Sequence, residues 1–293
     1  MQTRSKSGIV RPKLHPTLLL TTTEPTSLKQ ALSSPSWKTA MSLEYDALIK
    51  NQTWTLVPLP SNRTVVGCKW VYRIKENQDG TINKYKARLV AKGFHQKFGC
   101  DYSETFSPVI KPITIRVILT LDVTYHWPIK QVDINNAFLN GFLEEDVYMM
   151  QPPGFEVSDK TLVCKLNKAI YGLKQAPRAW YDRLTKTLLG FGFVQSRCDP
   201  SLLIYKQSQV CIYMLIYVDD IIVTGNSHSL VQSFISKLNG VFALKQLGDL
   251  DYFLGIEVKR TNSGSVILNQ AKYIRDLLQR TDMYNAKGIS TPQ

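Results

Sequence analysis

Two adjacent acids interrupt one of the most apolar segments of the sequence. Asp219 and Asp220 stand in IYVDDIIV, residues 216–223. Burying even one unpaired carboxylate is costly, and two like charges cost more. The simplest arrangement puts both acids in the tight turn of a β-hairpin, facing a cleft where a divalent cation neutralises them. The alternative is an ordinary hairpin turn, because aspartate is common in turns.

A third acid, Asp133, ends the strand-like segment IKQVDI and has no other acid within ten residues on either side. If that strand lies beside the hairpin, the carboxylates converge on one point. Several carboxylates with open positions for phosphate and water suit Mg²⁺. Two such ions about 4 Å apart stabilise the attacking and leaving oxygens of an in-line phosphoryl transfer. The pattern therefore predicts two-metal phosphoryl transfer.

The basic residues are concentrated in one part of the chain. The formal net charge is +13, and residues 63–116 contain eleven basic residues against four acidic ones. Trp70, Tyr72, Tyr85 and Phe94 are interleaved with these charges. Cations mixed with aromatic rings are typical of a surface that follows a nucleic-acid backbone and stacks on its bases. The alternative is a solvated basic face that only aids solubility.

Composition excludes several classes of protein. The 293 residues are 44% hydrophobic and 10% aromatic, which argues against disorder of the whole chain. The longest apolar run, 210–218, is shorter than the roughly 20 residues of a membrane-spanning helix. The five cysteines form no CxxC pair and the four histidines are scattered, so we expect neither a zinc site nor a disulfide framework. No secretion signal is visible, which predicts reduced cytosolic or nuclear thiols.

The elements expected around these residues are mixed. Residues 1–35 are expected to be an unstructured tail. A β-hairpin is expected from 64–76 and from 85–94, and it carries the basic cluster. Apolar spacing also predicts helices at 36–51, 113–125, 176–189, 229–239 and 272–280, and strands at 127–133, 202–206, 210–218, 252–259 and 265–269. This order favours an α+β fold.

Several long blocks carry a family resemblance. The sequence resembles the reverse transcriptase region of a copia-type LTR-retrotransposon Pol polyprotein from about Trp37 to Pro292. The blocks are KARLVAKGFHQ (86–96), DYSETFSPV (101–109), QVDINNAFLNG (131–141), YGLKQAPRAWY (171–181), YVDDIIVTG (217–225) and LGDLDYFLGIEV (247–258). Their number and order make the resemblance specific, whereas a lone pair of aspartates would not be.

The resemblance implies a right-hand polymerase with fingers, a palm and the start of a thumb, the palm being an antiparallel sheet backed by helices. Residues 1–35 would be a disordered basic tail. Residues 36–127, with part of 142–170, would form the fingers. Residues 128–141 and 171–258 would form the palm, and residues 259–293 the end of the primer grip and a partial thumb.

The resemblance also implies roles for individual residues. Asp133, Asp219 and Asp220 would be catalytic and, with the carbonyl of Ile134, would bind two Mg²⁺ ions, for which Mn²⁺ can substitute. Phe138 would exclude a ribose 2′-hydroxyl, Gln175 would support the incoming nucleotide, and Lys245 would protonate pyrophosphate. Two further roles each fall to a group of residues. The triphosphate would be clamped by one or more of Lys84, Lys86 and Arg88. The primer end would be gripped by Phe253, Leu254 and Gly255.

The implied activity is RNA-directed DNA polymerisation. The partners would be an RNA or DNA template with its primer and dNTPs, with no membrane involved. The domain would belong to a larger Pol polyprotein with integrase and RNase H, in the cytoplasmic virus-like particle of an active element. One alternative is a catalytically silent remnant that only binds nucleic acid. Another is a different two-metal palm enzyme that uses NTPs, which Phe138 disfavours.

Overall fold

The computed structural model describes residues 24–76, 81–261 and 265–286. The chain divides into a smaller unit, Met1–Glu44 with Trp70–Arg88, and a larger unit, Tyr45–Lys69 with Leu89–Gln293. Three elements run from one unit into the other: α2 (Pro35–Lys50), β3 (Cys68–Glu76) and β4 (Ile82–Ala91). The predicted carboxylate site lies wholly in the larger unit.

The smaller unit is a helical segment packed on a two-stranded hairpin. β3 and β4 pair as predicted, while the turn residues 77–80 lie outside the described residues. Trp37 of α2 is buried and meets two hairpin rings edge-on, with centroids 5.3 Å from Tyr72 and 5.0 Å from Tyr85. This aromatic cluster fixes the helix against the hairpin.

A short helix, α1 (Leu28–Ser33), corrects the prediction that residues 1–35 form a disordered tail. The Ser27 hydroxyl accepts a hydrogen bond from the Gln30 amide, and the Gln30 side chain accepts one from the Thr26 amide. This reciprocal arrangement resembles a capping box, which stabilises a helix start without any apolar periodicity. Residues 1–23 lie outside the described part of the chain.

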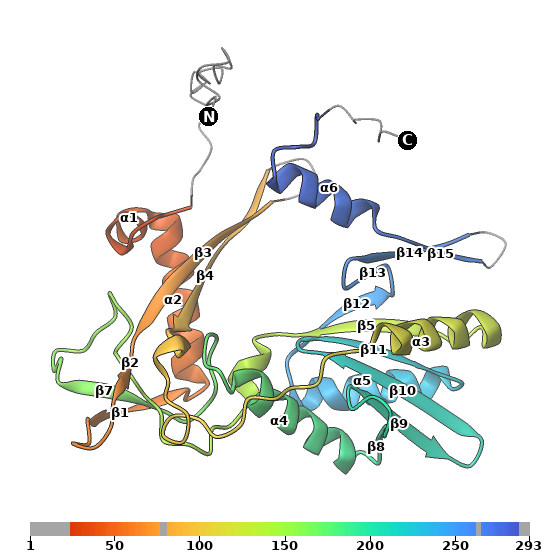
Figure 1. The fold of residues 1–293 in the computed structure, drawn as a ribbon, viewed down its shortest axis with the longest axis horizontal. Helices are drawn as coiled ribbons and strands as arrows, with labels where there is room; N and C mark the ends of the chain where they lie inside the picture. Colours follow the sequence, from red (N-terminus) through yellow and green to blue (C-terminus); the bar gives the residue numbers. More distant parts are fainter. Residues whose placement is uncertain (1–23, 77–80, 262–264, 287–293) are drawn as a thin grey trace, which may run out of the picture. The chain divides into compact units, whose positions relative to one another are not determined.

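The core of the larger unit is a six-stranded antiparallel sheet in the order β12-β5-β11-β10-β9-β8 (Figure 1). Its strands are β5 (Ile129–Ile134), β8 (Val194–Gln195), β9 (Leu202–Gln207), β10 (Val210–Tyr217), β11 (Asp220–Gly225) and β12 (Leu244–Asp249). The antiparallel sheet is confirmed, although β8 and β12 were not predicted. β5 lies between β11 and β12, which come much later in the chain.

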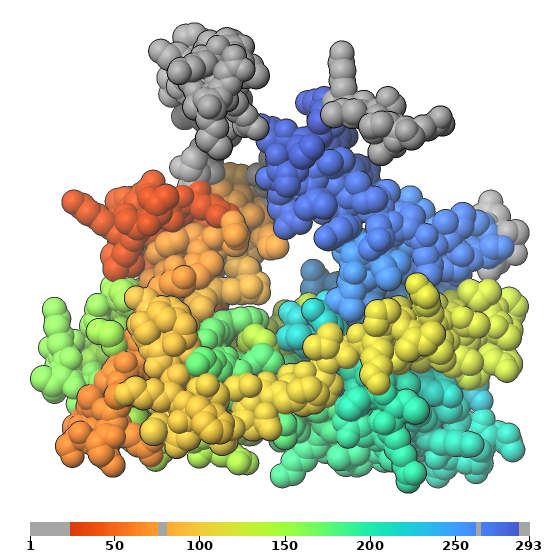
Figure 2. Space-filling view, viewed as in Figure 1, coloured from red at the N-terminus to blue at the C-terminus, as the bar shows by residue number. Residues whose placement is uncertain are grey.

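Each face of this sheet carries an apolar core, while the edge strands β8 and β12 are largely exposed. On one face α4 (Ala176–Gly190) and α5 (His228–Val241) pack Trp180, Leu184 and Phe234 against the sheet. The other face meets α3 (Pro112–Tyr125) and the sheet of β13 (Tyr252–Phe253), β14 (Ile256–Arg260) and β15 (Val266–Asn269). α3 lies on the surface of the larger unit (Figure 2), and its outer side leaves Ile113 and Val117 exposed.

A second sheet in the larger unit escaped the sequence patterns. It has the order β1-β7-β6-β2 and is built from β1 (Trp54–Pro58), β2 (Val65–Val66), β6 (Tyr148–Met149) and β7 (Leu162–Leu166). These strands are too short to show an alternating pattern, and their pairing joins segments distant in sequence. Two 3-10 turns, Gly93–His95 and Ala137–Asn140, and the helix α6 (Ala271–Arg280) complete the elements. Across the described ranges, every helix is too short or too polar to cross a bilayer.

Candidate active site

The pairing of β5 with β11 brings two of the three predicted carboxylates together. Asp133 and Asp220 are direct partners across the antiparallel pair. Directly opposed residues in such a pair project from the same face of the sheet, with Cβ atoms about 5 Å apart. The third acid is tied to the same strand, because the amide of Ile134 donates to the carbonyl of Asp219 over 2.8 Å. Acids from distant parts of the sequence thus meet at one end of the sheet.

The turn of the β10–β11 hairpin differs by one position from the prediction. Tyr217 pairs with Asp220, so the turn residues are Val218 and Asp219, and Asp220 begins the next strand. Val218 has φ +53°, a left-handed conformation that is rare for a β-branched residue. Such a residue costs on the order of 1–3 kcal/mol and persists only where its surroundings hold it. The sequence pattern missed this strain because valine gives no turn signal.

The electrostatics of the site oppose the charge on Asp220. Burial raises its pKa, and the nearby Asp219 and Asp133 raise it further. The side-chain amide of Gln131 donates to Asp220 Oδ1 over 3.3 Å and acts in the opposite direction. A bound cation would relieve both the burial and the repulsion, so the set of oxygen donors fits a hard divalent ion. Within the described ranges, however, no three His, Cys, Asp or Glu side chains are gathered tightly enough to hold a metal.

A cavity of about 510 Å³ connects Asp220 to the β13–β14 hairpin. Its lining includes Gln131, Asp251, Leu254 and Gly255. Leu254 and Gly255 form the two-residue turn of that hairpin, and both have positive φ. Two of the three residues predicted to grip a primer end therefore share a cavity with a predicted catalytic acid. Phe253 is 2% exposed and belongs to the core between α3 and the sheet.

Lys245 is in register with the acids. It is the direct partner of Asp133 on β12, and Asp133 in turn partners Asp220 on β11. These three residues form a row across three neighbouring strands, and Lys245 is exposed. The row therefore places an exposed cation beside the two acids, and its predicted role toward pyrophosphate stays a prediction.

Phe138 and Gln175 have different surroundings. Phe138 is half-buried in the turn after β5, and its ring meets Tyr171 edge-on with centroids 4.8 Å apart. Gln175 is only 2% exposed; its side chain accepts from Gln96 Nε2 over 3.0 Å and donates to the carbonyl of Asp101 over 2.8 Å. Both ends of its amide are thus used within the protein.

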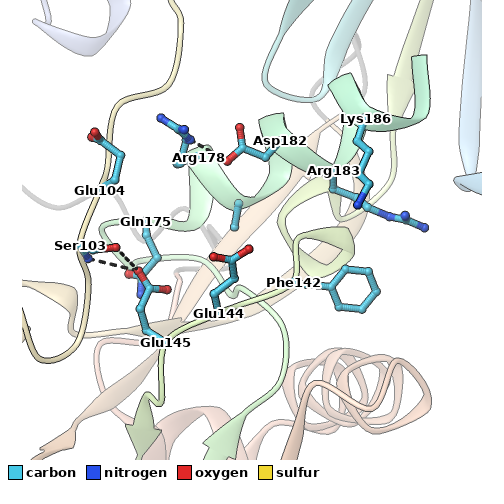
Figure 3. A pocket seen from close by; sticks show the side chains of 11 residues that line it. Ser103, Glu104, Phe142, Glu144, Glu145, Gln175, Arg178, Asp182, Arg183 and Lys186 are labelled. Atoms are coloured by element: carbon cyan, nitrogen blue, oxygen red, sulfur yellow. Dashed lines mark hydrogen bonds and ion pairs between the residues drawn. The ribbon is translucent and has the colours of Figure 1, made fainter. Parts of the chain in front are cut away.

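Gln175 also lines a second cavity, of about 400 Å³, between α4 and the loops around Ser103 and Glu145 (Figure 3). Arg178 and Asp182 both line this cavity and form an ion pair, with Arg178 Nε 2.6 Å from Asp182 Oδ2. Glu145 accepts from the Ser103 hydroxyl over 3.0 Å. Several of its polar groups are therefore already satisfied by one another.

The predicted triphosphate clamp lies on β4 in the smaller unit. Lys84, Lys86 and Arg88 alternate along the strand with Tyr85 and the buried Ala87, and the buried Leu89 follows them. Burial and the neighbouring cations lower the pKa of Lys86. The three cations share one face of the strand as predicted, and their role in binding a triphosphate stays a prediction.

Two residues of the site were missed by sequence reasoning. Gln131 stands two positions before Asp133 on the same strand, so the period-2 alternation of a strand would have placed it on the same face. Trp180 donates through its indole Nε1 to the carbonyl of Val218 over 2.7 Å. No local pattern links Trp180 to the hairpin, because the contact depends on how α4 packs under the sheet.

Comparison with known proteins identifies the family. The family described as reverse transcriptase (RNA-dependent DNA polymerase) matches residues 51–293. The chain belongs to this family. The copia-type resemblance drawn from the sequence blocks is thereby confirmed, and the mixed α and β structure agrees with a reverse transcriptase domain.

Several curated relatives of this reverse transcriptase domain are transposon polyproteins. The retrovirus-related Pol polyprotein from transposon RE1 of Arabidopsis thaliana is 51% identical over 297 residues, covering 100% of this chain and 20% of the relative. That from transposon RE2 of the same plant is 50% identical over the same length. That from transposon TNT 1-94 of Nicotiana tabacum is 42% identical over 92% of this chain. The chain spans about a fifth of the length of these relatives.

Proposed function

We propose that this reverse transcriptase domain is a working RNA-directed DNA polymerase of a copia-type retrotransposon Pol polyprotein. The observation that carries the proposal is the direct pairing of Asp133 with Asp220 beside a turn that holds Asp219. In the reaction a primer 3′-hydroxyl attacks the α-phosphate of a dNTP and pyrophosphate leaves. Such transfers depend mainly on positioning and charge stabilisation.

The three carboxylates and the carbonyl of Ile134 would hold two divalent cations. When bound, Mg²⁺ or Mn²⁺ would supply charge stabilisation to the attacking and leaving oxygens. The row from Lys245 through Asp133 to Asp220 supports a role for Lys245 as the proton donor to pyrophosphate. The residues at the turn of the β13–β14 hairpin would hold the primer end, because they line the cavity that contains Asp220.

The remaining roles concern the incoming nucleotide. Phe138 would exclude a ribose 2′-hydroxyl, supported by a ring whose position Tyr171 restricts. One or more of the cations of β4 would bind the β- and γ-phosphates. Gln175 would act indirectly, by holding the loop segments of Gln96 and Asp101 rather than by touching the nucleotide. The template with its primer, the dNTPs and the larger polyprotein are the proposed partners, in a cytoplasmic virus-like particle.

Primer extension on poly(rA)/oligo(dT) with Mg²⁺ or Mn²⁺, at low and moderate salt, tests the proposal. Asp219→Asn is expected to lower the rate of primer extension roughly a hundredfold or more. The substitution removes a charged carboxylate that would ligate the metal ions, while it keeps the shape of the side chain. Asp159→Asn is the matched control, because Asp159 is an exposed acid in the loop before β7. Equal extension by the two variants would contradict the assignment.

The alternative function is a silent retroelement remnant that only binds nucleic acid. It predicts salt-sensitive binding of the primer–template with no metal-dependent incorporation by the unsubstituted chain. Exchanging the inactive chain for the matching segment of a full-length relative polyprotein distinguishes the two. Extension in that full-length context supports a polymerase, whereas continued inactivity supports the remnant.

A further inference from the structure

The turn that presents Asp219 is strained and must be held in place. Val218 carries a branched side chain in the left-handed region, at φ +53°. Valine there prefers to relax toward the extended region, and this would rotate the peptide unit that leads into Asp219. Something outside the hairpin has to oppose that relaxation, because a two-residue turn has few contacts of its own.

Two hydrogen bonds fix the two turn carbonyls from different sides. The Ile134 amide donates to the Asp219 carbonyl, and this bond belongs to the sheet. The other comes from outside the sheet, where Trp180 Nε1 on α4 donates to the Val218 carbonyl over 2.7 Å. The carbonyl of the strained residue itself is therefore held by a side chain of the helix beneath.

The indole of Trp180 is rigid enough for this task. The side chain is 1% exposed and belongs to the core between α4, α5 and the sheet. Phe242 packs edge-on against it, with ring centroids 5.2 Å apart and planes at 83°. A donor fixed by packing loses little entropy when it forms its bond, so it can select one turn conformation.

We propose that Trp180 is a positioning residue for the catalytic turn: its indole N–H holds Val218 in the left-handed conformation and thereby sets the position of the Asp219 carboxylate. This inference rests on the proposed polymerase function. Without the bond, the turn relaxes and Asp219 moves relative to Asp133. A displacement of about 1 Å in a reacting or ligating group can cost on the order of a hundredfold in rate.

The first variant is Trp180→Phe, which keeps an aromatic ring and removes the donor. Tyr181→Phe is the matched control. Tyr181 is the next residue of α4, and its hydroxyl donates over the same 2.7 Å to the carbonyl of Pro200 rather than to a carbonyl of the turn. In primer extension we expect kcat to fall about tenfold or more in Trp180→Phe with little change in KM for dTTP, and to stay within about twofold in Tyr181→Phe. Equal effects of the two variants would overturn the proposal.

A second substitution separates positioning from loss of packing. Glycine adopts the left-handed conformation without steric cost, so Val218→Gly removes the strain that Trp180 opposes. In the Val218→Gly background, adding Trp180→Phe is expected to change kcat by less than about threefold. If the two losses simply multiply, Trp180 contributes packing alone and the proposal is wrong.

Binding of Mn²⁺, measured by electron paramagnetic resonance without nucleic acid, gives a readout independent of activity. Trp180→Phe is expected to weaken Mn²⁺ binding several-fold relative to Tyr181→Phe, with recovery in Val218→Gly/Trp180→Phe. If the unsubstituted chain shows no extension but this pattern of Mn²⁺ binding holds, the proposed activity fails and the role of Trp180 stands. If Mn²⁺ binding is the same in both single variants, or absent from the unsubstituted chain, the role of Trp180 fails.

Discussion

The surroundings of Asp220 disfavour the charged form of its carboxyl group. Burial and two neighbouring acids raise its pKa, while the hydrogen bond from Gln131 opposes them. An acid whose pKa is raised in the folded state stabilises the protein below its unfolded pKa. That contribution to stability is lost as pH rises through the pKa of the folded state, because the native state then releases a proton that it had bound more tightly than the unfolded chain. In the absence of a cation, this carboxylate weakens the fold at neutral pH.

Asp220→Asn should therefore raise Tm at pH 7 in EDTA, and the gain should shrink as pH falls toward the ordinary pKa of aspartate. Thermal unfolding at a series of pH values measures it. Asp159→Asn is a control of opposite sign. The hydroxyl and amide of Thr161 donate to Asp159 and lower its pKa, so its loss should reduce Tm at pH 7. A gain for Asp220→Asn that does not vary with pH would contradict this account.

Phe138 gives a test of substrate choice. Its ring is held by Tyr171, and truncation to alanine opens the space that a 2′-hydroxyl would need. Phe138→Ala is expected to raise kcat/KM for UTP relative to dTTP roughly tenfold or more. Tyr171→Phe keeps the ring contact and serves as the control, with little change in this ratio. An unchanged ratio in Phe138→Ala would show that the ring is only a packed core residue.

At the scale of elements, tight turns decide where the functional groups lie. The β13–β14 hairpin has both turn residues at positive φ, Leu254 at 50° and Gly255 at 86°. This is the pattern of a type I′ turn, which fits the twist of the flanking strands. The cavity beside Asp220 is thus bordered by a turn of two residues with left-handed backbone, Leu254 and Gly255, of which only Leu254 has a side chain.

Two glycine substitutions with opposite expected signs test that geometry. A Cβ on Gly255 would lie 3.7 Å from Tyr273, an ordinary contact, so Gly255→Ala should cost about 1 kcal/mol through backbone strain alone. Gly240 lies in α5, where a Cβ would have no neighbouring atom within 4 Å, so Gly240→Ala should add about 0.5–1 kcal/mol of stability. Urea unfolding measures both changes. The same sign for both would contradict the backbone assignment.

The sequence predicted those elements whose signal is local. α3, α4, α5 and the β10–β11 hairpin follow apolar periodicity, and α2 begins one residue earlier than predicted because Pro35 suits the first helical position. The sheet of β1, β2, β6 and β7 depends on pairing between distant short segments, and its sequence shows no alternation. The three acids were identifiable because charge within an apolar run is anomalous. The support from Trp180 was not, since it depends on packing.

For the whole molecule, net charge is the property that bears on the proposed encounter with nucleic acid. The net charge of +13 and the basic hairpin favour a polyanion, and binding through phosphates releases counterions. A protein with about 6–10 phosphate contacts loses roughly 10³–10⁵ in affinity between about 50 and 200 mM salt. Long-range attraction of this kind acts before any residue of the site makes contact.

We expect the affinity for a primer–template to fall steeply with salt, and the cations of β4 to contribute to that slope. Fluorescence anisotropy of a labelled primer–template in EDTA gives the slope of log K against log salt. Replacing Lys84, Lys86 and Arg88 by alanine should reduce its magnitude by about 0.9 for each phosphate that is no longer neutralised. Alanine at Lys206 and Lys237, exposed on β9 and α5, should leave it nearly unchanged. Equal slopes for both variants would assign the attraction to net charge alone.

The position of β5 between β11 and β12 has a consequence for synthesis of the chain. The strand that bears Asp133 is made before both of its neighbours in the sheet, which come from much later segments. Until those segments leave the ribosome, β5 has two unpaired edges and cannot complete its hydrogen bonds. Pairings so distant in sequence form slowly and expose strand edges meanwhile. The acidic site is thus among the last parts of the domain to form during translation, and a chain interrupted before β12 leaves one edge of β5 open to pairing with another copy.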